Sequence, residues 1–193
     1  IGPSGSGKST LLNIISLIDK PSSGFLKLNN IKINENNIDQ RDMIRSEKIG
    51  IIYQDKNLLS DFTTLENVYI ARLSLSNDKK KAISDAKNLI KKVGLDKRLS
   101  HFPSELSGGE SQRVAISRAL INSPEIILAD EPTGNLDHKN AKDIFKLLFS
   151  LKHKKRIIIF ATHNRYFADM SDCKLSLING KISTVNVRNK KNF

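Results

Sequence analysis

Residues 2–9 constrain the fold of this chain more than any other segment. They read Gly-Pro-Ser-Gly-Ser-Gly-Lys-Ser, which matches the pattern of a phosphate-binding P-loop in full. The glycines let backbone N–H groups point inward as an anion-binding nest, and the following helix turns its positive N-terminus towards the same point. Lys8 can reach the β- and γ-phosphates, and the Ser9 hydroxyl can ligate Mg²⁺. Alone, this motif predicts a P-loop NTPase and leaves kinases and GTPases open.

A second motif combines an apolar strand with two acidic residues. The run Ile-Ile-Leu-Ala at 126–129 is followed by Asp130 and Glu131. A strand that ends in Asp places a carboxylate beside the P-loop, where it can hold Mg²⁺ through water. Glu131 is the candidate that orients and polarises the attacking water. Pro132 then prevents the strand from continuing to pair.

A third motif, Leu-Ser-Gly-Gly-Glu at 106–110, precedes an apolar helix. Ser107 and Glu110 have the spacing of a capping box, so a well-capped helix is the simplest interpretation. The two glycines beside the cap also make a second anion-binding helix N-terminus. Two phosphate cradles in one chain are unusual, unless the second serves a nucleotide held by another subunit.

Together these motifs resemble Walker A, the signature and Walker B of the ABC ATPases. Three further motifs complete the resemblance: Gln54 after the strand at 50–53 matches the Q-loop, residues 134–137 (Gly-Asn-Leu-Asp) match the D-loop, and His163 matches the switch histidine. All six stand in the family's order across nearly the whole chain. Six ordered motifs are far more specific than any one of them.

The resemblance implies ATP as ligand, Mg²⁺ as its metal ion and a homodimer in head-to-tail arrangement. Lys8 of one subunit and Ser107 of the other would sandwich each ATP, which accounts for the second cradle. Gln54 would sense Mg²⁺ and couple to a transmembrane partner, and His163 would contact the γ-phosphate. Hydrolysis removes the γ-phosphate bridge and lets the dimer open.

The expected site residues fall into three groups. The catalytic residues are Glu131, His163, Lys8 and Gln54. The Mg²⁺ ligands are Ser9, Gln54 and Asp130. The nucleotide-binding residues are Gly2, Pro3, Ser4, Gly5, Ser6, Gly7, Lys8, Ser9, Thr10, Ser107, Gly108, Gly109, Glu110 and Asp137.

The expected fold is an α/β P-loop ABC-ATPase core with a parallel sheet, an antiparallel β edge and an inserted helical subdomain. Continuous, branched apolar runs predict buried parallel strands at 49–53, 126–129 and 157–161. Alternation predicts an antiparallel hairpin over 25–33, and apolar periodicity predicts helices over 9–18, 78–93, 110–121 and 141–151.

These elements predict one ABC ATPase domain over 1–193, with a RecA-like core at 1–57 and 123–193 and a helical subdomain at about 58–122. A P-loop is normally fed by a buried strand, and Ile1 is the only residue of it in the sequence. We therefore expect the domain to lack its N-terminal strand. The aromatic residue that stacks on adenine in this family would lie upstream of Ile1.

Three stretches, at 54–68, 101–105 and 129–148, are similar to the lipoprotein-releasing branch of the family, which extracts lipoproteins from the bacterial inner membrane. That branch implies permease partners of the LolC/LolE type and a peripheral place on the cytoplasmic face of the inner membrane, with membrane contact only through those partners. The D-loop form is shared with MacB-type exporters and FtsE-type cell-division complexes, so an ATPase of either kind is the alternative.

The net charge of +12 raises the question of nucleic acid as a partner. The lysines are scattered, without the interleaved aromatics that stack bases, so no nucleic-acid partner is expected. A soluble ABC ATPase acting on nucleic acid remains a further alternative, although such proteins carry paired domains or coiled-coil inserts that 193 residues cannot hold. A binding-only pseudo-ATPase is disfavoured by the intact Lys8, Asp130, Glu131 and His163. No run approaches the ~20 apolar residues of a membrane span.

A few residues depart from the family pattern or match no motif. Glu110 replaces the final Gln of the common signature, and Asn164 follows the switch histidine where an acidic residue is usual. Cys173, the single cysteine, is interpreted as inert filler. The histidines outside the motifs are interpreted as ordinary surface residues: His101, His138 and His153. The basic cluster at 188–191 is interpreted as a solvated tail.

Overall fold

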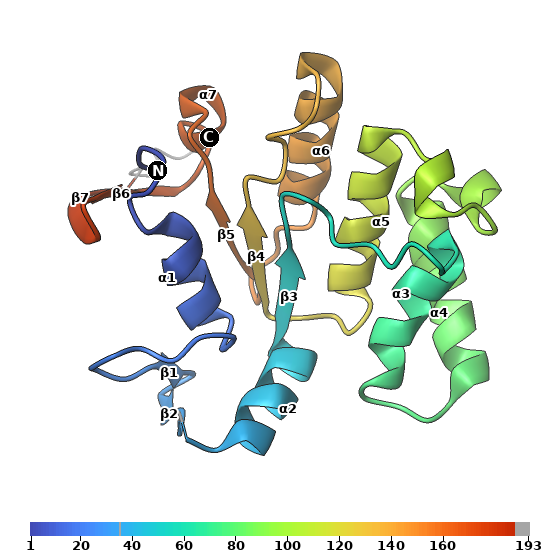
Figure 1. The fold of residues 1–193 in the computed structure, drawn as a ribbon, viewed down its shortest axis with the longest axis horizontal. Coiled ribbons are helices and arrows are strands. Elements are labelled where there is room, and N and C mark those ends of the chain that lie inside the picture. Colours follow the sequence, from blue (N-terminus) through green and yellow to red (C-terminus); the bar gives the residue numbers. More distant parts are fainter. Residues whose placement is uncertain (35, 188–193) are drawn as a thin grey trace.

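The computed structural model describes residues 1–34 and 36–187, so the basic cluster at 188–191 lies outside the described residues. At its centre, three parallel strands pair in the order β3 (Ile49–Ile52), β4 (Ile126–Asp130) and β5 (Ile157–Ala161) (Figure 1). Ile126 lies opposite both Ile49 and Ile157 in the register. The carboxyl ends of all three strands therefore meet at one edge of the sheet, and the predicted parallel sheet is confirmed.

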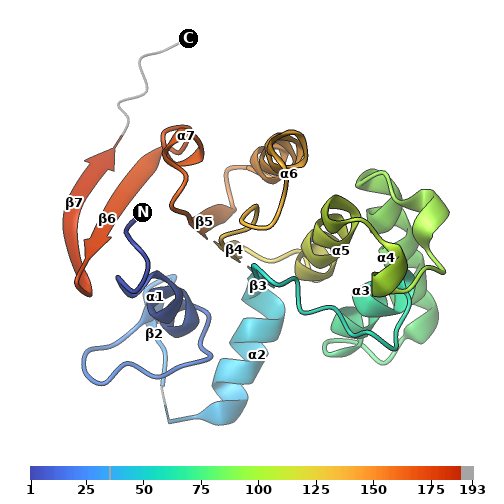
Figure 2. The same ribbon diagram turned by 45° about the horizontal axis from the view of Figure 1, so that its top comes forward.

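The alternation of side chains along β4 divides the core into two layers. Leu128 points towards α1 (Lys8–Ile15), where it joins Leu12 in one apolar cluster. Ile127 points to the other face, where it packs with residues of α5 (Gly108–Leu120) and α6 (His138–Ser150). Figure 2 shows these layers, with α1 on one side of the strands and α5 and α6 on the other.

The helical subdomain is built from α3 (Thr64–Leu73), α4 (Lys79–Lys92) and α5. Val68, Ile90 and Val114, one from each helix, are fully buried in a common cluster. Two short 3₁₀ turns, η1 (Asp96–Arg98) and η2 (Pro103–Glu105), connect α4 to α5. The inserted helical subdomain of the predicted fold is confirmed.

The predicted hairpin over 25–33 forms as a short antiparallel pair, β1 (Lys27–Leu28) and β2 (Ile31–Lys32). The two asparagines between the strands both adopt positive φ, 49° for Asn29 and 64° for Asn30, as a tight hairpin turn requires. The helix predicted over 9–18 ends earlier, at Ile15, because Leu17 takes a left-handed conformation with φ 62°.

Sequence periodicity missed α3 and four further elements: α2 (Ile38–Lys48), α7 (Arg165–Ala168), β6 (Cys173–Ile178) and β7 (Lys181–Val187). Helix α2 has a weak apolar stripe because its one buried residue is Arg41, whose guanidinium donates to Leu17 O at 2.6 Å and Ile18 O at 2.8 Å. Asn164, noted above as a departure from the family pattern, caps α7 by accepting from Tyr166 N at 3.0 Å.

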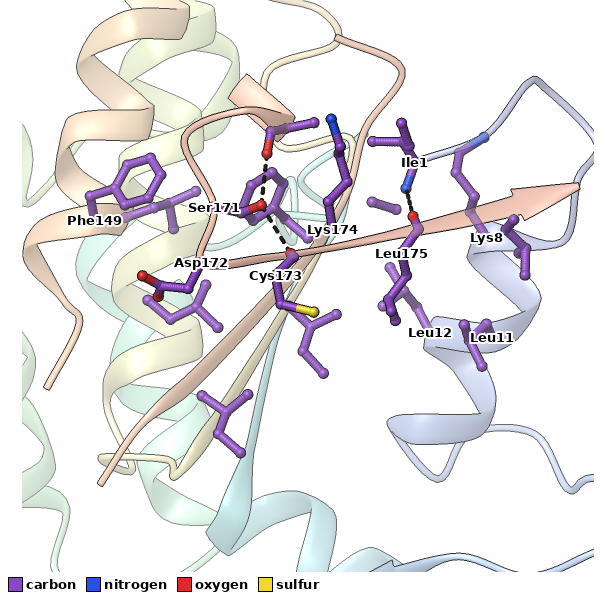
Figure 3. A pocket seen from close by; sticks show the side chains of 18 of the residues that line it. Ile1, Lys8, Leu11, Leu12, Phe149, Ser171, Asp172, Cys173, Lys174 and Leu175 are labelled. Carbon is purple, nitrogen blue, oxygen red and sulfur yellow. Dashed lines mark hydrogen bonds between the residues drawn. The ribbon is translucent and has the colours of Figure 1, made fainter. Parts of the chain in front are cut away.

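Strands β6 and β7 form an antiparallel hairpin of their own and do not pair with β5. An apolar slot of about 460 Å³ lies between β5 and β6, with Leu11, Leu12 and Phe149 among its lining residues (Figure 3). Strand β5 is therefore less covered than predicted, and Ile157 is 60% exposed. Cys173 is exposed and lies on the rim of this slot.

Within residues 1–34 and 36–187, none of the helices combines the length and apolar character needed to span a bilayer.

Candidate functional site

The loop that precedes α1 leaves backbone donors free for a ligand. Gly5 and Gly7 have φ of 75° and 98°, in the region where side chains are strained. Gly7 is the N-cap of α1 and supplies no side-chain hydrogen bond to the first turn. The unsatisfied N–H groups and the helix dipole therefore favour an anion at this point, as the motif predicts.

Strand β6 and its turn hold this loop in place. The amino group of Ile1 donates to Leu175 O at 2.6 Å, Leu177 N donates to Ile1 O at 2.8 Å, and Gly180 N donates to Ser6 O at 3.1 Å. A Cβ on Gly2 would lie 2.3 Å from Leu177 O, so only glycine fits there. The Ser6 hydroxyl is buried without a hydrogen-bond partner, which leaves a polar group for a bound ligand to satisfy.

Lys8 is directed back over its own loop. Its Nζ donates to Gly2 O at 2.9 Å and to Pro3 O at 2.8 Å. A phosphate oxygen seated in the loop would offer the same ammonium a charge-assisted partner, which is the stronger interaction. Ser9 and Thr10 follow in the first turn of α1, and both are exposed.

The acidic pair stands at the end of β4, where the neighbouring strand brings in the histidine. Asp130 pairs in register with Ala161, and Glu131 N donates to Ala161 O at 3.0 Å. Glu131 adopts φ 42°, and its side chain is 12% exposed. His163 Nδ1 lies 2.9 Å from Glu131 Oε1, so the predicted base and the predicted switch residue are hydrogen-bonded to each other.

Gln54 follows β3 at the same edge of the sheet and is exposed. A Cβ on Gly134 would lie 3.1 Å from Gln54 Nε2, so the glycine leaves room for this amide beside the predicted D-loop. Asn135 Nδ2 also donates to Asp55 Oδ1, at 3.3 Å. The segment after β3 and the segment after β4 thus contact each other.

The signature residues form a closed cap on α5. Ser107 Oγ accepts from Glu110 N at 3.2 Å, and Glu110 Oε2 accepts from Ser107 N at 2.8 Å. Arg98 Nε donates to Glu110 Oε1 at 2.8 Å. The Ser107 N–H and then the Arg98 guanidinium lower the pKa of Glu110 from 4.5 to about 2. The predicted capping box is confirmed in its geometry.

Asp137 caps the adjacent helix, α6. Its Oδ1 accepts from Lys139 N and Asn140 N, both at 3.0 Å, and Asn140 Nδ2 donates to Oδ2. The Asn140 hydrogen bonds lower the pKa of Asp137. A Cβ on Gly109 would lie 2.9 Å from Asn140 Oδ1, so the helix starts of α5 and α6 pack closely.

The predicted site residues divide into two groups in space. The first group lies around the carboxyl edge of the central sheet: the P-loop with the first turn of α1, Gln54 after β3, Asp130 and Glu131 at the end of β4, and His163 after β5. Ser107, Gly108, Gly109 and Glu110 begin α5, on the face of the sheet opposite α1, and Asp137 caps the neighbouring α6 (Figures 1 and 2). Within one chain, the P-loop and the signature therefore lie apart and do not form a single phosphate site.

Magnesium fits the oxygen donors that lie around the carboxyl edge of the central sheet. Among the described residues, no cluster of three or more carboxylate, imidazole or thiol side chains could hold a metal by itself. Ser9, Gln54 and Asp130 offer a hydroxyl, an amide and a carboxylate oxygen, and α1 packs against β4. Mg²⁺ is usually bound by one or two such protein oxygens together with substrate phosphates.

Sequence reasoning missed the partners that shape these residues, and it misjudged one histidine. His101 is half-buried, with Nε2 3.1 Å from Arg98 Nη1, so it is not an ordinary surface residue. His138 and His153 are exposed. The capping role of Asn140 could have been found, because it stands three residues after Asp137. Nothing in the local sequence points to Leu177 as the support of Gly2.

Comparisons with known proteins agree on a family. The family described as ABC transporter matches residues 1–134. The chain is 48% identical to the lipoprotein-releasing system ATP-binding protein LolD of Rickettsia typhi over 95% of this chain and 81% of that protein. It is 43% identical to the LolD of Cytophaga hutchinsonii, over 94% of this chain and 84% of that protein.

Solved structures show the same fold. The dimeric ATP-binding cassette MJ0796, in a post-hydrolysis state bound to ADP and Pi, superposes with a TM-score of 0.87. It is 38% identical, over 96% of this chain and 82% of that one. CbiO1 of Clostridium perfringens, part of an ABC transporter complex, superposes with a TM-score of 0.85 at 28% identity, over 97% of this chain and 75% of that one.

Proposed function

The chain belongs to the ABC transporter family as an ATP-hydrolysing, ATP-binding subunit, and from this premise we propose that it powers the release of lipoproteins from the bacterial inner membrane. The observation that carries the cargo assignment is the 48% identity to a lipoprotein-releasing ATP-binding protein over 95% of the chain. The stretches at 54–68, 101–105 and 129–148, which are similar to the same branch, are the parts of the sequence that favour this assignment.

The working unit in this proposal is a head-to-tail dimer. The P-loop of one subunit and Ser107 of the other would hold one ATP between two helix N-termini, which together favour the triphosphate charge. This accounts for cradles that lie on opposite faces of the sheet in one chain. The solved relative described as dimeric, with ADP and Pi, supports the arrangement.

The contacts of the resting site indicate what ATP must change. Lys8 exchanges the carbonyls of Gly2 and Pro3 for phosphate oxygens. His163 releases Glu131 and donates towards the γ-phosphate, which leaves the Glu131 carboxylate to hold and polarise the attacking water. Ser9, Asp130 and Gln54 would hold Mg²⁺, which would compensate the charge of the phosphates.

An apolar patch on the helical subdomain is the proposed contact with the permease. Leu59, Phe62 and Phe102 are 45%, 37% and 42% exposed. Thr64 N and Thr64 Oγ1 both donate to His101 O, at 2.8 and 3.1 Å, which ties the start of α3 to the segment carrying Phe102. Exposed aromatic side chains of this kind act as anchors in protein interfaces.

We also propose that the domain division follows the two cores, with the helical subdomain at about 58–122 and the slot between β5 and β6 receiving a strand. Ile1 already pairs with β6 through two main-chain hydrogen bonds. An extended apolar segment continuing from Ile1 would pair with the free edges of β5 and β6 and cover the apolar walls of the slot.

The test combines the chain with permease subunits of the LolC/LolE type in proteoliposomes that carry a lipoprotein. We expect ATP-dependent release of the lipoprotein. Phe62→Glu should weaken association with the permease roughly tenfold or more, because a buried aromatic anchor is lost. Leu75→Glu is the matched control, since Leu75 is also 37% exposed but follows the other end of α3.

Equal weakening of permease association by Phe62→Glu and Leu75→Glu would refute the apolar patch as the contact with the permease. Stimulation of ATP hydrolysis by such a permease without any lipoprotein release would refute lipoproteins as the cargo. It would still support the role of the chain as the ATPase of a transporter.

A further inference from the structure

The loop that follows Gln54 contains two adjacent residues in an unfavourable backbone conformation. Lys56 and Asn57 have φ of 61° and 46°, and neither is glycine. Left-handed backbone at residues with a Cβ persists only where the surroundings enforce it, and such strain gathers at functional sites. The loop must therefore be held from outside.

Arg118 of α5 is the group that holds it. Its Nη1 donates to Asn57 O and its Nη2 to Lys56 O, both at 2.6 Å. Burial lowers the pKa of the Arg118 guanidinium. Within the described part of the chain, Arg118 forms no ion pair with a carboxylate. A planar fork holds its two parallel donors in a fixed orientation towards two neighbouring carbonyls, whereas a lysine ammonium is a point charge on a flexible stem and does not fix that orientation.

The far end of the same loop is fixed by α3. Asn67 is 1% exposed. Its Oδ1 accepts from Leu59 N at 2.8 Å, and its Nδ2 donates to Leu59 O at 3.0 Å and Phe62 O at 2.9 Å. The loop is thus tied by charged and buried groups to the helical subdomain. On the side of the core, Asp55 and Asn135 make a longer contact of 3.3 Å.

We propose that Arg118 is a positioning residue for ATP hydrolysis. By holding Lys56 and Asn57 in their left-handed conformation, it fixes the direction in which Gln54 leaves β3 and lies beside Gly134, in the segment that follows β4. Through α5, the same side chain links the helix that begins with Ser107 to the loop that begins with Gln54. The inference rests on the proposed role of Gln54 as a Mg²⁺ ligand.

The test is a double-mutant cycle between Arg118→Lys and Gln54→Ala, read as kcat and as the Mg²⁺ concentration for half-maximal activity. Arg118→Lys should lower kcat about tenfold, the factor expected when one charge-assisted hydrogen bond is lost. It should also raise the half-maximal Mg²⁺ concentration. In the Gln54→Ala background the same substitution should change kcat less than twofold, because residues that act as a unit are not additive.

Two controls separate positioning from folding. Arg113→Lys removes a comparable contact on the same helix, from Arg113 Nη1 to Val93 O at 3.2 Å, and does not touch the loop. It should leave kcat and the Mg²⁺ dependence within twofold. Lys56→Gly, which relieves the left-handed strain, should restore at least part of the kcat lost in Arg118→Lys.

If the Arg118→Lys variant does not fold, a substitution in the loop itself tests the same inference. Asn57→Pro forces a φ near −65° where the chain needs 46°, and leaves α5 intact. It should reproduce the loss of kcat and its masking by Gln54→Ala. Full additivity of either variant with Gln54→Ala would overturn the inference about Arg118. Normal turnover of Gln54→Ala alone would overturn the proposed role of Gln54 and the inference with it.

Discussion

The helix starts of α1 and α5 solve the same problem in opposite ways. Helix α1 begins at Gly7 with no side-chain cap, and the nearby ammonium of Lys8 is held only by loop carbonyls. Helix α5 begins with a complete capping box between Ser107 and Glu110, which Arg98 reinforces. Among the described residues, the start of α1 has no side-chain acceptor for its N–H donors. The start of α5 has such an acceptor in the hydroxyl of Ser107.

The difference teaches that the two cradles are not equivalent for the free subunit. An anion at α1 gains donors that are otherwise unsatisfied, so we expect the P-loop to bind ATP in the free subunit. An anion at α5 meets a helix start where Ser107 Oγ already accepts from Glu110 N and the Glu110 carboxylate already accepts from Ser107 N. In the proposed head-to-tail dimer, the signature is therefore expected to bind nucleotide only when a second subunit presents a bound ATP to it.

The largest effect expected from this comparison concerns Lys8 and Ser107 in a Glu131→Gln background, where turnover is abolished and ATP-driven dimers accumulate. Lys8→Ala should weaken ATP binding to the monomer roughly hundredfold, because charge-assisted hydrogen bonds to phosphate are lost. Ser107→Arg should leave that binding nearly unchanged. Both should abolish the dimer seen by light scattering in ATP.

Loss of monomer binding in Ser107→Arg would show that both cradles act in one chain and would break the comparison. Normal turnover of Glu131→Gln would refute the role of Glu131 as the base.

An intermediate effect is expected from the same substitution made at each helix start. Gly7→Ala should destabilise the chain by about 1–2 kcal/mol, because alanine is strained at a φ of 98°. Gly108→Ala meets only the tip of Leu136, at 3.4 Å, and should be neutral or stabilise by about 0.5 kcal/mol. Urea unfolding of both variants measures the sign and size of the change in the free energy of unfolding. A Gly108→Ala variant as unstable as Gly7→Ala would contradict the prediction.

The smallest effect is the pH dependence of the α5 cap. The pKa of Glu110 is lowered from 4.5 to about 2 by the Ser107 N–H and Arg98, so the ionised cap stabilises the folded chain above pH 4.5. That contribution is lost as the pH falls from 4.5 towards 2. Wild type should lose about 1 kcal/mol more stability than Glu110→Gln between pH 6 and 3.

Removal of the second partner checks the cause. Arg98→Met should raise the pKa of Glu110 in the folded chain, so that the loss of stability still begins near pH 4.5 but is smaller and is complete at a higher pH than in wild type. An unchanged pH profile in Arg98→Met would assign the whole effect to the cap itself.

The sequence predicted the parts of the fold whose patterns are local. Strand β5 was located at its exact bounds, and the P-loop and capping box follow from residue types at fixed spacing. It did not predict β6 and β7, or α2, whose buried residue is an arginine. Short elements with polar buried faces carry no periodic signal, because their burial is set by distant segments.

The site shows the same limit. Which residues stand at the ends of β3, β4 and β5 follows from the motifs, but the contacts among them do not. The hydrogen bond between Glu131 and His163 and the fork of Arg118 on Lys56 and Asn57 depend on a sheet register and a helix position. Both join residues more than thirty positions apart, which no spacing rule covers.

The support of Gly2 by Leu177, and of Ser6 by Gly180, sets an order for biosynthesis. The ribosome makes the P-loop long before β6, yet the loop acquires its anchors only after the β6–β7 turn has been translated. Contacts this distant in sequence close late in folding. A nascent chain halted before this turn would carry the whole motif and still lack a formed ATP site, so ATP binding reports that translation has passed the turn.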